Sequence, residues 1–280
     1  MIEVVREAHA KVNVFLRVLG LRDDGYHELE SLVVPLTLSD TITCRSAQRL
    51  ALSVEGGDPS LTKGPDNLAV VAALALAEAT GTFAGADITL TKRIPVAAGL
   101  GGGSADAAGV LSALNELWGT GLAEEDLLRI AADVGSDVPA TLAARSVVVR
   151  GRGELLERVT VPPMWWAVVP AAFHVRTPDA FRWWDEEGGT TGPDPSELLD
   201  VLARGDLRAA AWQMFNDLQV PVFGHHPELL STSQALAGAG ALAVLMCGSG
   251  PTLAGLFPDV TSARIAAAAI TGALVAETRS

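Results

Sequence analysis

Residues 95–106 of the chain read PVAAGLGGGSAD. Four of the five residues from Gly99 to Gly103 are glycine, and an apolar run with helical spacing follows. Glycine in ordinary secondary structure costs roughly 0.5–1 kcal/mol relative to alanine, so a dense cluster needs a physical reason. Two explanations are open at this point: a structural turn or connector, or a loop whose backbone a phosphate group approaches closely.

The glycine loop connects a predicted strand to a predicted helix. Residues 86–95 have strand character and end at a proline, and residues 104–119 place apolar side chains at helical spacing. A helix start offers free N–H groups and the positive end of the helix dipole, which favour anions. No GxxxxGK(S/T) string occurs, Ser104 holds the third glycine position of GxGxxG, and the loop lacks the last glycine of GxSxG. The loop therefore matches none of the three motifs tested: the Walker A loop, the Rossmann dinucleotide-binding loop and the nucleophile elbow.

Composition limits the classes of protein that fit. The chain has 280 residues, is 49% apolar and carries a net charge of −13, which argues against wrapping nucleic acid or lying on an anionic membrane. Cys44 and Cys247 are far apart and outside any CxxC or Cys/His cluster, as is typical of reduced thiols in the cytoplasm. The N-terminus lacks a signal-peptide core, and no apolar stretch reaches the roughly 18–20 residues of a membrane span. We expect a cytoplasmic protein without a membrane segment.

The remaining sequence predicts an α+β protein in two parts that divide near residues 150–165. In the first part, strands are expected at 12–20, 32–44, 50–56 and 86–95, and helices at 68–80, 104–119, 123–135 and 136–144. Asp66 is the expected N-cap of the helix at 68–80. The second part has strands within 146–170, helices within 196–238, a strand–glycine loop–strand unit at 241–257 and a helix at 261–270.

Three further features interrupt the pattern of an ordinary core. Lys11 lies in the strand-like stretch AHAKVNVFL, on the same face as Asn13, and could be a solvated edge lysine. Asp137 lies in GSDVP at a helix start, where capping is the alternative explanation. The stretch CGSGPT, residues 247–252, could be a plain hairpin connection.

Taken together and in this order, these stretches form a specific pattern. AHAKVNVFLRVLGLRDDGYHEL (8–29), PVAAGLGGGSADAA (95–108) and CGSGPT (247–252) resemble the three motifs of the GHMP kinase superfamily. Within it, K-x-N followed by R-x-D-G-Y-H resembles the 4-diphosphocytidyl-2-C-methyl-D-erythritol kinases, as do GSDVP and the NDL of residues 216–218. The resemblance implies a two-lobed α+β fold, with an N-terminal β/α lobe over residues 1–155 and a C-terminal ferredoxin-like lobe over residues 156–280.

The implied reaction moves the γ-phosphoryl group of ATP to the 2-hydroxyl of 4-diphosphocytidyl-2-C-methyl-D-erythritol, in the non-mevalonate route to isoprenoid precursors. ATP and this alcohol are the expected partners, Mg²⁺ accompanies ATP, and the chain is expected to act as a monomer or homodimer. A homoserine or mevalonate type of kinase is the alternative. The RDDGYH turn, residues 22–27, argues against it because a small acceptor has no base to stack on.

The resemblance also assigns residues to roles. Lys11 and Asp137 match the catalytic pair. The ATP-binding positions are Asn67, Pro95, Val96, Ala97, Ala98, Gly99, Leu100, Gly101, Gly102, Gly103, Ser104 and Ala105, with Ser104 also the candidate Mg²⁺ ligand. The substrate-binding positions are Asn13, Tyr26, His27 and Phe181, and the third-motif loop contributes Gly248, Ser249 and Gly250.

The chain departs from the family pattern at three positions. His9 stands where proline is frequent, Ala105 where a second serine is common, and Gln219 where an acidic residue often follows NDL. For the second face of the cytosine, Trp183 and Trp184 are alternatives to Phe181. None of these departures removes the catalytic pair.

Overall fold

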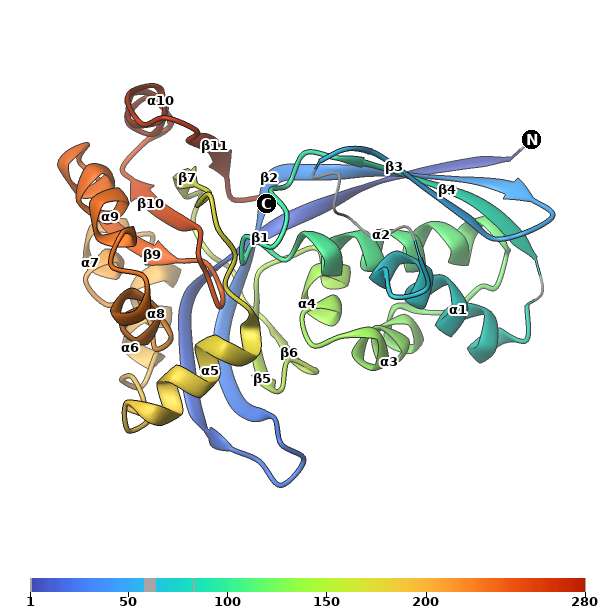
Figure 1. The fold of residues 1–280 in the computed structure, drawn as a ribbon, viewed down its shortest axis with the longest axis horizontal. Helices are drawn as coiled ribbons and strands as arrows, with labels where there is room; N and C mark the ends of the chain where they lie inside the picture. Colours follow the sequence, from blue (N-terminus) through green and yellow to red (C-terminus); the bar gives the residue numbers. More distant parts are fainter. Residues whose placement is uncertain (1, 58–63, 83, 280) are drawn as a thin grey trace. The chain divides into compact units, whose positions relative to one another are not determined.

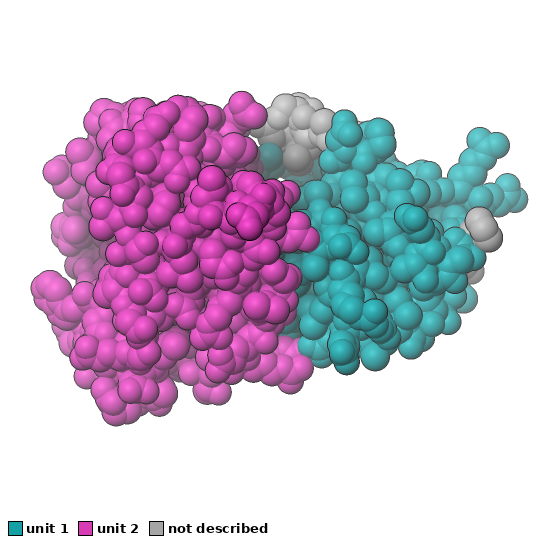
Figure 2. All heavy atoms as spheres, turned by 90° about the horizontal axis from the view of Figure 1, so that it is seen from below, with its two compact units in different colours: residues 1–10, 38–96, 101–144 teal, residues 11–37, 97–100, 145–280 magenta. Residues whose placement is uncertain are grey.

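The computed structural model describes residues 2–57, 64–82 and 84–279. The chain forms two compact units, which Figure 2 colours separately. Unit 1 comprises Met1–Ala10, Leu38–Val96 and Gly101–Ala144, and unit 2 comprises Lys11–Thr37, Ala97–Leu100 and Arg145–Ser280. The two long strands β1 (Glu3–Leu21) and β2 (His27–Ala47) each contribute residues to both units.

The strands of unit 1 follow the order β3, β4, β2, β1. β3 (Ala51–Gly56) runs parallel to β4 (Gly85–Lys92), and β4 runs antiparallel to the second half of β2. A parallel pair needs a crossover connection, and the helix α1 (Leu68–Thr80) provides it. This β-α-β unit places the end of β4, and so the start of the glycine loop, next to the end of β3.

The four helices of unit 1 lie together on one face of these strands (Figure 1). They are α1, α2 (Gly102–Leu117), α3 (Glu124–Val134) and α4 (Val138–Ala143). Small buried side chains on the facing surfaces of α1 and α2 allow these two helices to pack closely. The expected N-cap of α1 was wrong by one residue: Asn67 Oδ1, rather than Asp66, accepts a hydrogen bond from the N–H of Ala69 at 2.9 Å.

Unit 2 contains a four-stranded antiparallel sheet in the order β11, β7, β10, β9. The strands are β7 (Trp165–Val169), β9 (Ala243–Met246), β10 (Leu253–Phe257) and β11 (Leu274–Glu277). In chain order, helices separate the first two strands, and α10 (Val260–Ala269) precedes the last. This is the ferredoxin-like β-α-β-β-α-β arrangement, which confirms the predicted C-terminal fold.

The rest of unit 2 surrounds its core. The additional elements are β5 (Val147–Gly151), β6 (Leu155–Arg158), α5 (Thr177–Glu186), α6 (Ser196–Ala203), α7 (Leu207–Ala211), β8 (Phe215–Asn216), α8 (Gln219–His225) and α9 (Leu229–Gly238). β5 extends the first half of β2, and β8 pairs in parallel with β1 at Phe15. Among the described residues, no helix combines the length and apolarity needed to cross a bilayer.

Candidate active site

Lys11 and Asn13 are buried neighbours on β1, within unit 2, and each is 4% exposed. The Oδ1 atom of Asn13 accepts two hydrogen bonds, from Lys11 Nζ at 2.9 Å and from the N–H of Gly248 at 3.0 Å. Its Nδ2 atom donates to Ser31 Oγ at 2.8 Å. Lys11 is therefore not a solvated edge lysine, and the first and third motifs are joined through one amide side chain.

Asn216 fixes the other side of the third-motif loop. Its Nδ2 atom donates to the carbonyl oxygens of Met246 and Gly248, both at 2.7 Å, and its Oδ1 atom accepts from the N–H of Leu218 at 3.0 Å. Gln219 Oε1 accepts from the N–H of Met246 at 2.7 Å. The sequence showed NDL without assigning it a role; the structure shows that Asn216 anchors the loop and that Gln219 has a partner of its own.

Residues 97–100 pack backbone to backbone against this third-motif loop. A Cβ on Gly99, whose φ is +75°, would lie 2.0 Å from the carbonyl oxygen of Cys247. A Cβ on Gly248 would lie 2.8 Å from Lys11 Nζ and 3.1 Å from the carbonyl oxygen of Gly99. The N–H of Lys11 also donates to the carbonyl oxygen of Leu100 at 3.0 Å. Unit 2 thus brings together residues of all three motifs.

The helix α2 begins directly after the glycine loop, within unit 1. Gly101 is its N-cap in the left-handed region, at a φ of 72°, and no side chain caps the helix. Among the described residues outside its own helix, a Cβ on Gly103 would meet Leu68 Cδ1 alone, at 3.7 Å, so these residues leave room above the first turn. The hydroxyl of Ser104 has no hydrogen-bond partner among the described residues. Uncapped N–H groups, open space and a hydroxyl together suit an anion such as a phosphate.

A buried charged triad links the end of β4 to the first turns of α2. Lys92 Nζ donates to Asp40 and to Asp106 Oδ2, the latter at 2.5 Å. Asp40 also accepts from the backbone N–H groups of Arg93 and Ile94. Burial raises the pKa of Asp106 to about 7, although the Lys92 ammonium opposes this shift. No local sequence pattern indicated this triad, which holds together β4 and α2, the two elements that flank the glycine loop.

Asp137 occupies the N-cap position of α4, but its side chain makes no capping bond. Its backbone carbonyl instead accepts from the N–H of Thr141 at 3.2 Å and from its Oγ1 at 3.1 Å. The hydroxyl of Thr141 also reaches the carbonyl oxygen of Ser104, at 3.1 Å, which ties α4 to α2 within unit 1. The capping explanation for the Asp137 carboxylate is therefore wrong, because the helix does not use it.

The predicted cytosine-binding residues of unit 2 are an exposed Tyr26 and a stacked pair of His27 and Phe181. Tyr26, in the turn between β1 and β2, is 51% exposed, with the Arg152 guanidinium 5.4 Å from its ring centre. The ring of His27 stacks on Phe181 of α5, with centroids 4.7 Å apart and an interplanar angle of 19°. Trp183 stacks on His225 instead, at 4.2 Å. Of the three α5 aromatics, Phe181 is the one that lies against the face of His27.

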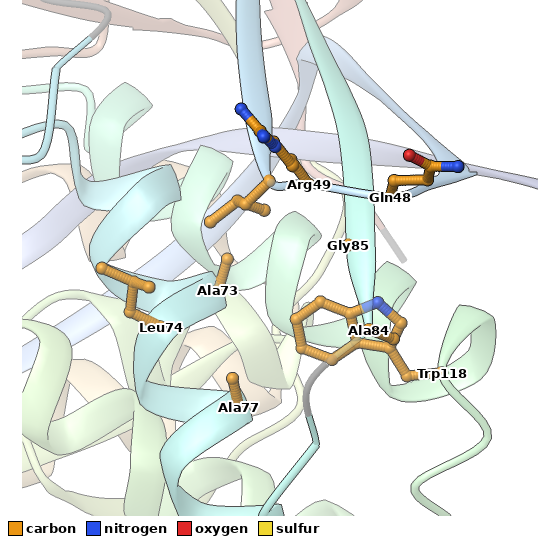
Figure 3. A pocket seen from close by; sticks show the side chains of 9 residues that line it. Gln48, Arg49, Ala73, Leu74, Ala77, Ala84, Gly85 and Trp118 are labelled. Atoms are coloured by element: carbon orange, nitrogen blue, oxygen red, sulfur yellow. The ribbon is translucent and has the colours of Figure 1, made fainter.

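A pocket in unit 1 lies apart from the predicted site residues (Figure 3). It is lined by Gln48, Arg49, Leu50, Ala73, Leu74, Ala77, Ala84, Gly85 and Trp118. None of these residues belongs to the three motifs. Among the described residues, no group of three or more His, Cys, Asp or Glu side chains could hold a metal ion.

Comparison with known families agrees with this geometry. Residues 67–145 match the family described as GHMP kinases N terminal domain, and residues 198–276 match GHMP kinases C terminal. The first match includes Asn67, the glycine loop and Asp137, and the second includes Asn216 and the third-motif loop. The fold and the motif residues therefore define a GHMP kinase.

Relatives narrow the class further. Curated 4-diphosphocytidyl-2-C-methyl-D-erythritol kinases from Symbiobacterium thermophilum and Deinococcus radiodurans are 42% and 44% identical to this chain. The alignments cover 90% and 94% of the chain, and 90% and 87% of the relatives. The chain belongs to the family of 4-diphosphocytidyl-2-C-methyl-D-erythritol kinases.

Solved structures show the same relationship. A crystal structure of a 4-(cytidine 5'-diphospho)-2C-methyl-D-erythritol kinase matches with a TM-score of 0.84 and 37% identity, covering 99% of this chain and 100% of that one. A homoserine kinase from Cytophaga hutchinsonii matches with a TM-score of 0.72 at 21% identity, covering 99% and 94% of the two chains. The latter likeness shows the fold alone.

Proposed function

We infer that this chain transfers the γ-phosphoryl group of ATP to the 2-hydroxyl of 4-diphosphocytidyl-2-C-methyl-D-erythritol, giving the 2-phosphate and ADP. Family membership over nine-tenths of the chain supports this activity. The observation that carries it is the buried junction at Asn13, whose Oδ1 atom binds both Lys11 Nζ and the N–H of Gly248. This junction fixes the position of a buried lysine ammonium next to the third-motif loop.

For ATP, we propose that the segment Pro95–Ala105 surrounds the phosphates and that Asn67 contacts the nucleotide. The first turn of α2 supports this role, because its N–H groups are uncapped and its Gly103 leaves space. Mg²⁺ takes oxygen ligands, keeps several waters and binds substrate phosphates, so it needs few protein ligands. The unpaired Ser104 hydroxyl fits that requirement, and we propose it as the protein ligand when Mg²⁺ arrives with ATP.

Phosphoryl transfer depends on positioning and charge neutralisation more than on covalent chemistry. The bond between the γ-phosphorus and the β,γ-bridging oxygen breaks, and a new bond forms to the oxygen of the 2-hydroxyl. We assign the hydroxyl proton to the Asp137 carboxylate, which does not cap α4. Lys11 stabilises the negative charge that develops during transfer, and Asn13 holds its ammonium.

For the cytidine half of the substrate, we propose Tyr26 as the stacking aromatic, His27 as the hydrogen-bonding group and Phe181 as the aromatic on the second face of the cytosine. The exposure of Tyr26 and the packing of Phe181 on His27 support these assignments. A base that stacks on an exposed aromatic ring gains about 1–3 kcal/mol in other proteins. We therefore expect Tyr26→Ala to raise the KM of this substrate more than the KM of ATP.

We further propose that the enzyme acts in the cytoplasm, as a monomer or homodimer, on small molecules alone. The net charge of −13 supports the absence of a nucleic-acid partner, because such partners select basic surfaces. Size-exclusion chromatography with light scattering decides between the two oligomeric states.

The catalytic assignment is tested with Asp137→Ala. Because general base catalysis contributes about 10²–10⁴-fold, we expect kcat to fall by that factor while the KM of ATP changes little. Asp133→Ala is the matched control, since Asp133 is an exposed carboxylate on the preceding helix α3. Near-normal turnover in Asp137→Ala would remove this carboxylate from the mechanism.

A further inference from the structure

In the described part of the chain, one ring nitrogen of His27 has a hydrogen-bond partner and the other has none. Its Nε2 atom lies 3.1 Å and 3.2 Å from the two carboxylate oxygens of Asp185, while Nδ1 has no partner in the described part of the chain. A carboxylate only accepts hydrogen bonds, so Nε2 must carry the proton and donate it. In the neutral ring, Nδ1 is then an acceptor.

The ring of His27 is held on three sides by one helix. Phe181 stacks on its face, Trp184 lies edge-on with centroids 5.8 Å apart, and Asp185 binds Nε2. These three α5 residues have the spacing i, i+3 and i+4, which places them on one helical face. The His27 side chain is only 10% exposed, so its orientation is fixed by these contacts.

The helix α5 is itself anchored at both ends. At its start, Thr177 Oγ1 lies 2.9 Å from Ser249 Oγ in the third-motif loop. Near its end, the indole N–H of buried Trp184 donates to the carbonyl oxygen of Thr190 at 3.1 Å. The carboxylate of Asp185 is thus presented to His27 by a fixed helix that also touches the third motif.

We propose that Asp185 is a positioning residue that keeps the proton of His27 on Nε2, so that Nδ1 selects a nucleobase with an amino group, cytosine rather than uracil. This inference rests on the proposed function, in which His27 contacts the base. The 4-amino group of cytosine can donate to Nδ1, whereas the 4-oxo group of uracil would bring a second acceptor against it. A binding site whose buried polar group forms a hydrogen bond with its ligand discriminates against an analogue that cannot form that bond, because the group of the site is then left unpaired.

The position of Asp185 is otherwise unfavourable for the helix. It lies in the last turn of α5, where no basic residue is present and the helix dipole disfavours a carboxylate. A carboxylate at this end of the helix is not stabilised by the helix dipole. Removing the carboxylate should therefore leave the melting temperature unchanged or slightly raised, while base selection suffers.

The test compares kcat/KM for the cytidine substrate with that for its uridine counterpart. The wild type should prefer the cytidine compound by 100-fold or more, and Asp185→Ala should reduce that preference about tenfold, mainly through a higher KM for the cytidine compound. Asp185→Asn should fall between them, because the amide oxygen can still accept from Nε2. Glu186→Gln is the matched control, since Glu186 is exposed on the same helix and pairs with Arg182 instead.

A second measurement reads the proton directly. In ¹⁵N NMR spectra at pH 8, His27 should show a protonated Nε2 and an unprotonated Nδ1 in the wild type, and a tautomer mixture in Asp185→Ala. An unchanged base preference in Asp185→Ala, or a protonated Nδ1 in the wild type at that pH, would overturn the inference. Failure of the wild type to phosphorylate the cytidine compound at all would instead contradict the proposed function.

Discussion

The two glycine-rich loops of this kinase use glycine for different physical reasons. In the third-motif loop, an added Cβ would lie 2.8 Å from Lys11 Nζ at Gly248 and 2.6 Å from Met246 Sδ at Gly250. At the start of α2, a Cβ on Gly103 would meet Leu68 Cδ1, at 3.7 Å, and no other atom of the described residues within 4 Å outside its own helix and chain neighbours. The third-motif loop needs glycine so that the protein can pack against itself, whereas the space beside Gly103 is open within the described part of the chain; we propose that the ATP phosphates use it.

Gly99 shows that the same distinction also separates glycines within the glycine loop that precedes α2. Its Cβ would lie 2.0 Å from the Cys247 carbonyl oxygen, so it belongs with the packing glycines although it stands only four residues before Gly103. A sequence pattern cannot separate the two kinds, because both appear as glycine. Substitution by alanine can separate them, since one kind loses stability and the other loses ligand affinity.

The largest effect on stability is expected for Gly99→Ala. A left-handed backbone costs an alanine about 1–2 kcal/mol, and overpacking adds roughly 1–3 kcal/mol. The free energy of unfolding should therefore fall by about 2–5 kcal/mol. Gly119→Ala is the matched control: its φ is +65° and a Cβ there meets nothing within 4 Å. If chemical denaturation gives equal losses for both variants, the contact with Cys247 does not require glycine.

Asn216→Ala should have the next largest effect on stability, because it leaves the carbonyl oxygens of Met246 and Gly248 without the Asn216 Nδ2 donor. Each unsatisfied buried group costs about 1–3 kcal/mol; because a carbonyl oxygen has a second lone pair, we take the lower end of this range and expect the two groups to cost about 2–3 kcal/mol together, with a lower kcat as the loop loosens. Asn216→Asp keeps the shape and the Oδ1 acceptor but removes the donor, and should show a similar loss. A fully stable, fully active Asn216→Asp enzyme would mean that these bonds do not fix the loop.

Gly103→Ala should behave in the opposite way. Alanine favours a helix by about 0.8–1 kcal/mol over glycine, so the melting temperature should stay the same or rise. The added methyl group occupies the space above the first turn of α2, and we expect the KM of ATP to rise about tenfold. An unchanged KM for ATP would show that the phosphates do not approach Gly103.

Last, pH should change the stability contributed by the buried triad of Lys92, Asp40 and Asp106 beside the glycine loop. Because the pKa of Asp106 is raised to about 7 from its ordinary value of 3.8, the folded protein binds a proton there that the unfolded chain releases. The contribution to stability is therefore present below about pH 4 and is lost as the pH rises towards 7, by at most about 1.4 kcal/mol per pH unit. Asp106→Asn should flatten this part of the stability curve in denaturation at several pH values; parallel curves for the two proteins would contradict the shift.

Much of the fold follows from local sequence signals. The helix predicted at 68–80 is α1 itself, and the strand–loop–strand unit at 241–257 contains β9 and β10. The lengths of β1 and β2 were underestimated, because both strands run from one compact unit into the other. Such an arrangement depends on pairing with distant segments such as β4 and β5, which no local pattern shows.

The motif residues were found because their spacing is specific, but their partners were not. Asp185 and Asn216 form hydrogen bonds with residues that are 158 and 30 or 32 positions away, respectively. In the sequence, Asp185 looks like one of several acidic residues on an exposed helix. Only the structure shows that it faces His27, whereas its neighbour Glu186 pairs with Arg182.

The choice of acceptor decides whether this chain is a kinase of the cytidyl compound or of another small alcohol. Purified enzyme with ATP and Mg²⁺ is offered 4-diphosphocytidyl-2-C-methyl-D-erythritol, homoserine or mevalonate in turn, and ADP and phosphorylated product are quantified. We predict that ADP forms in a one-to-one ratio with the 2-phosphate of the cytidyl compound, and that the other two alcohols give only background. ADP formation that requires homoserine or mevalonate and ignores the cytidyl compound would contradict the account.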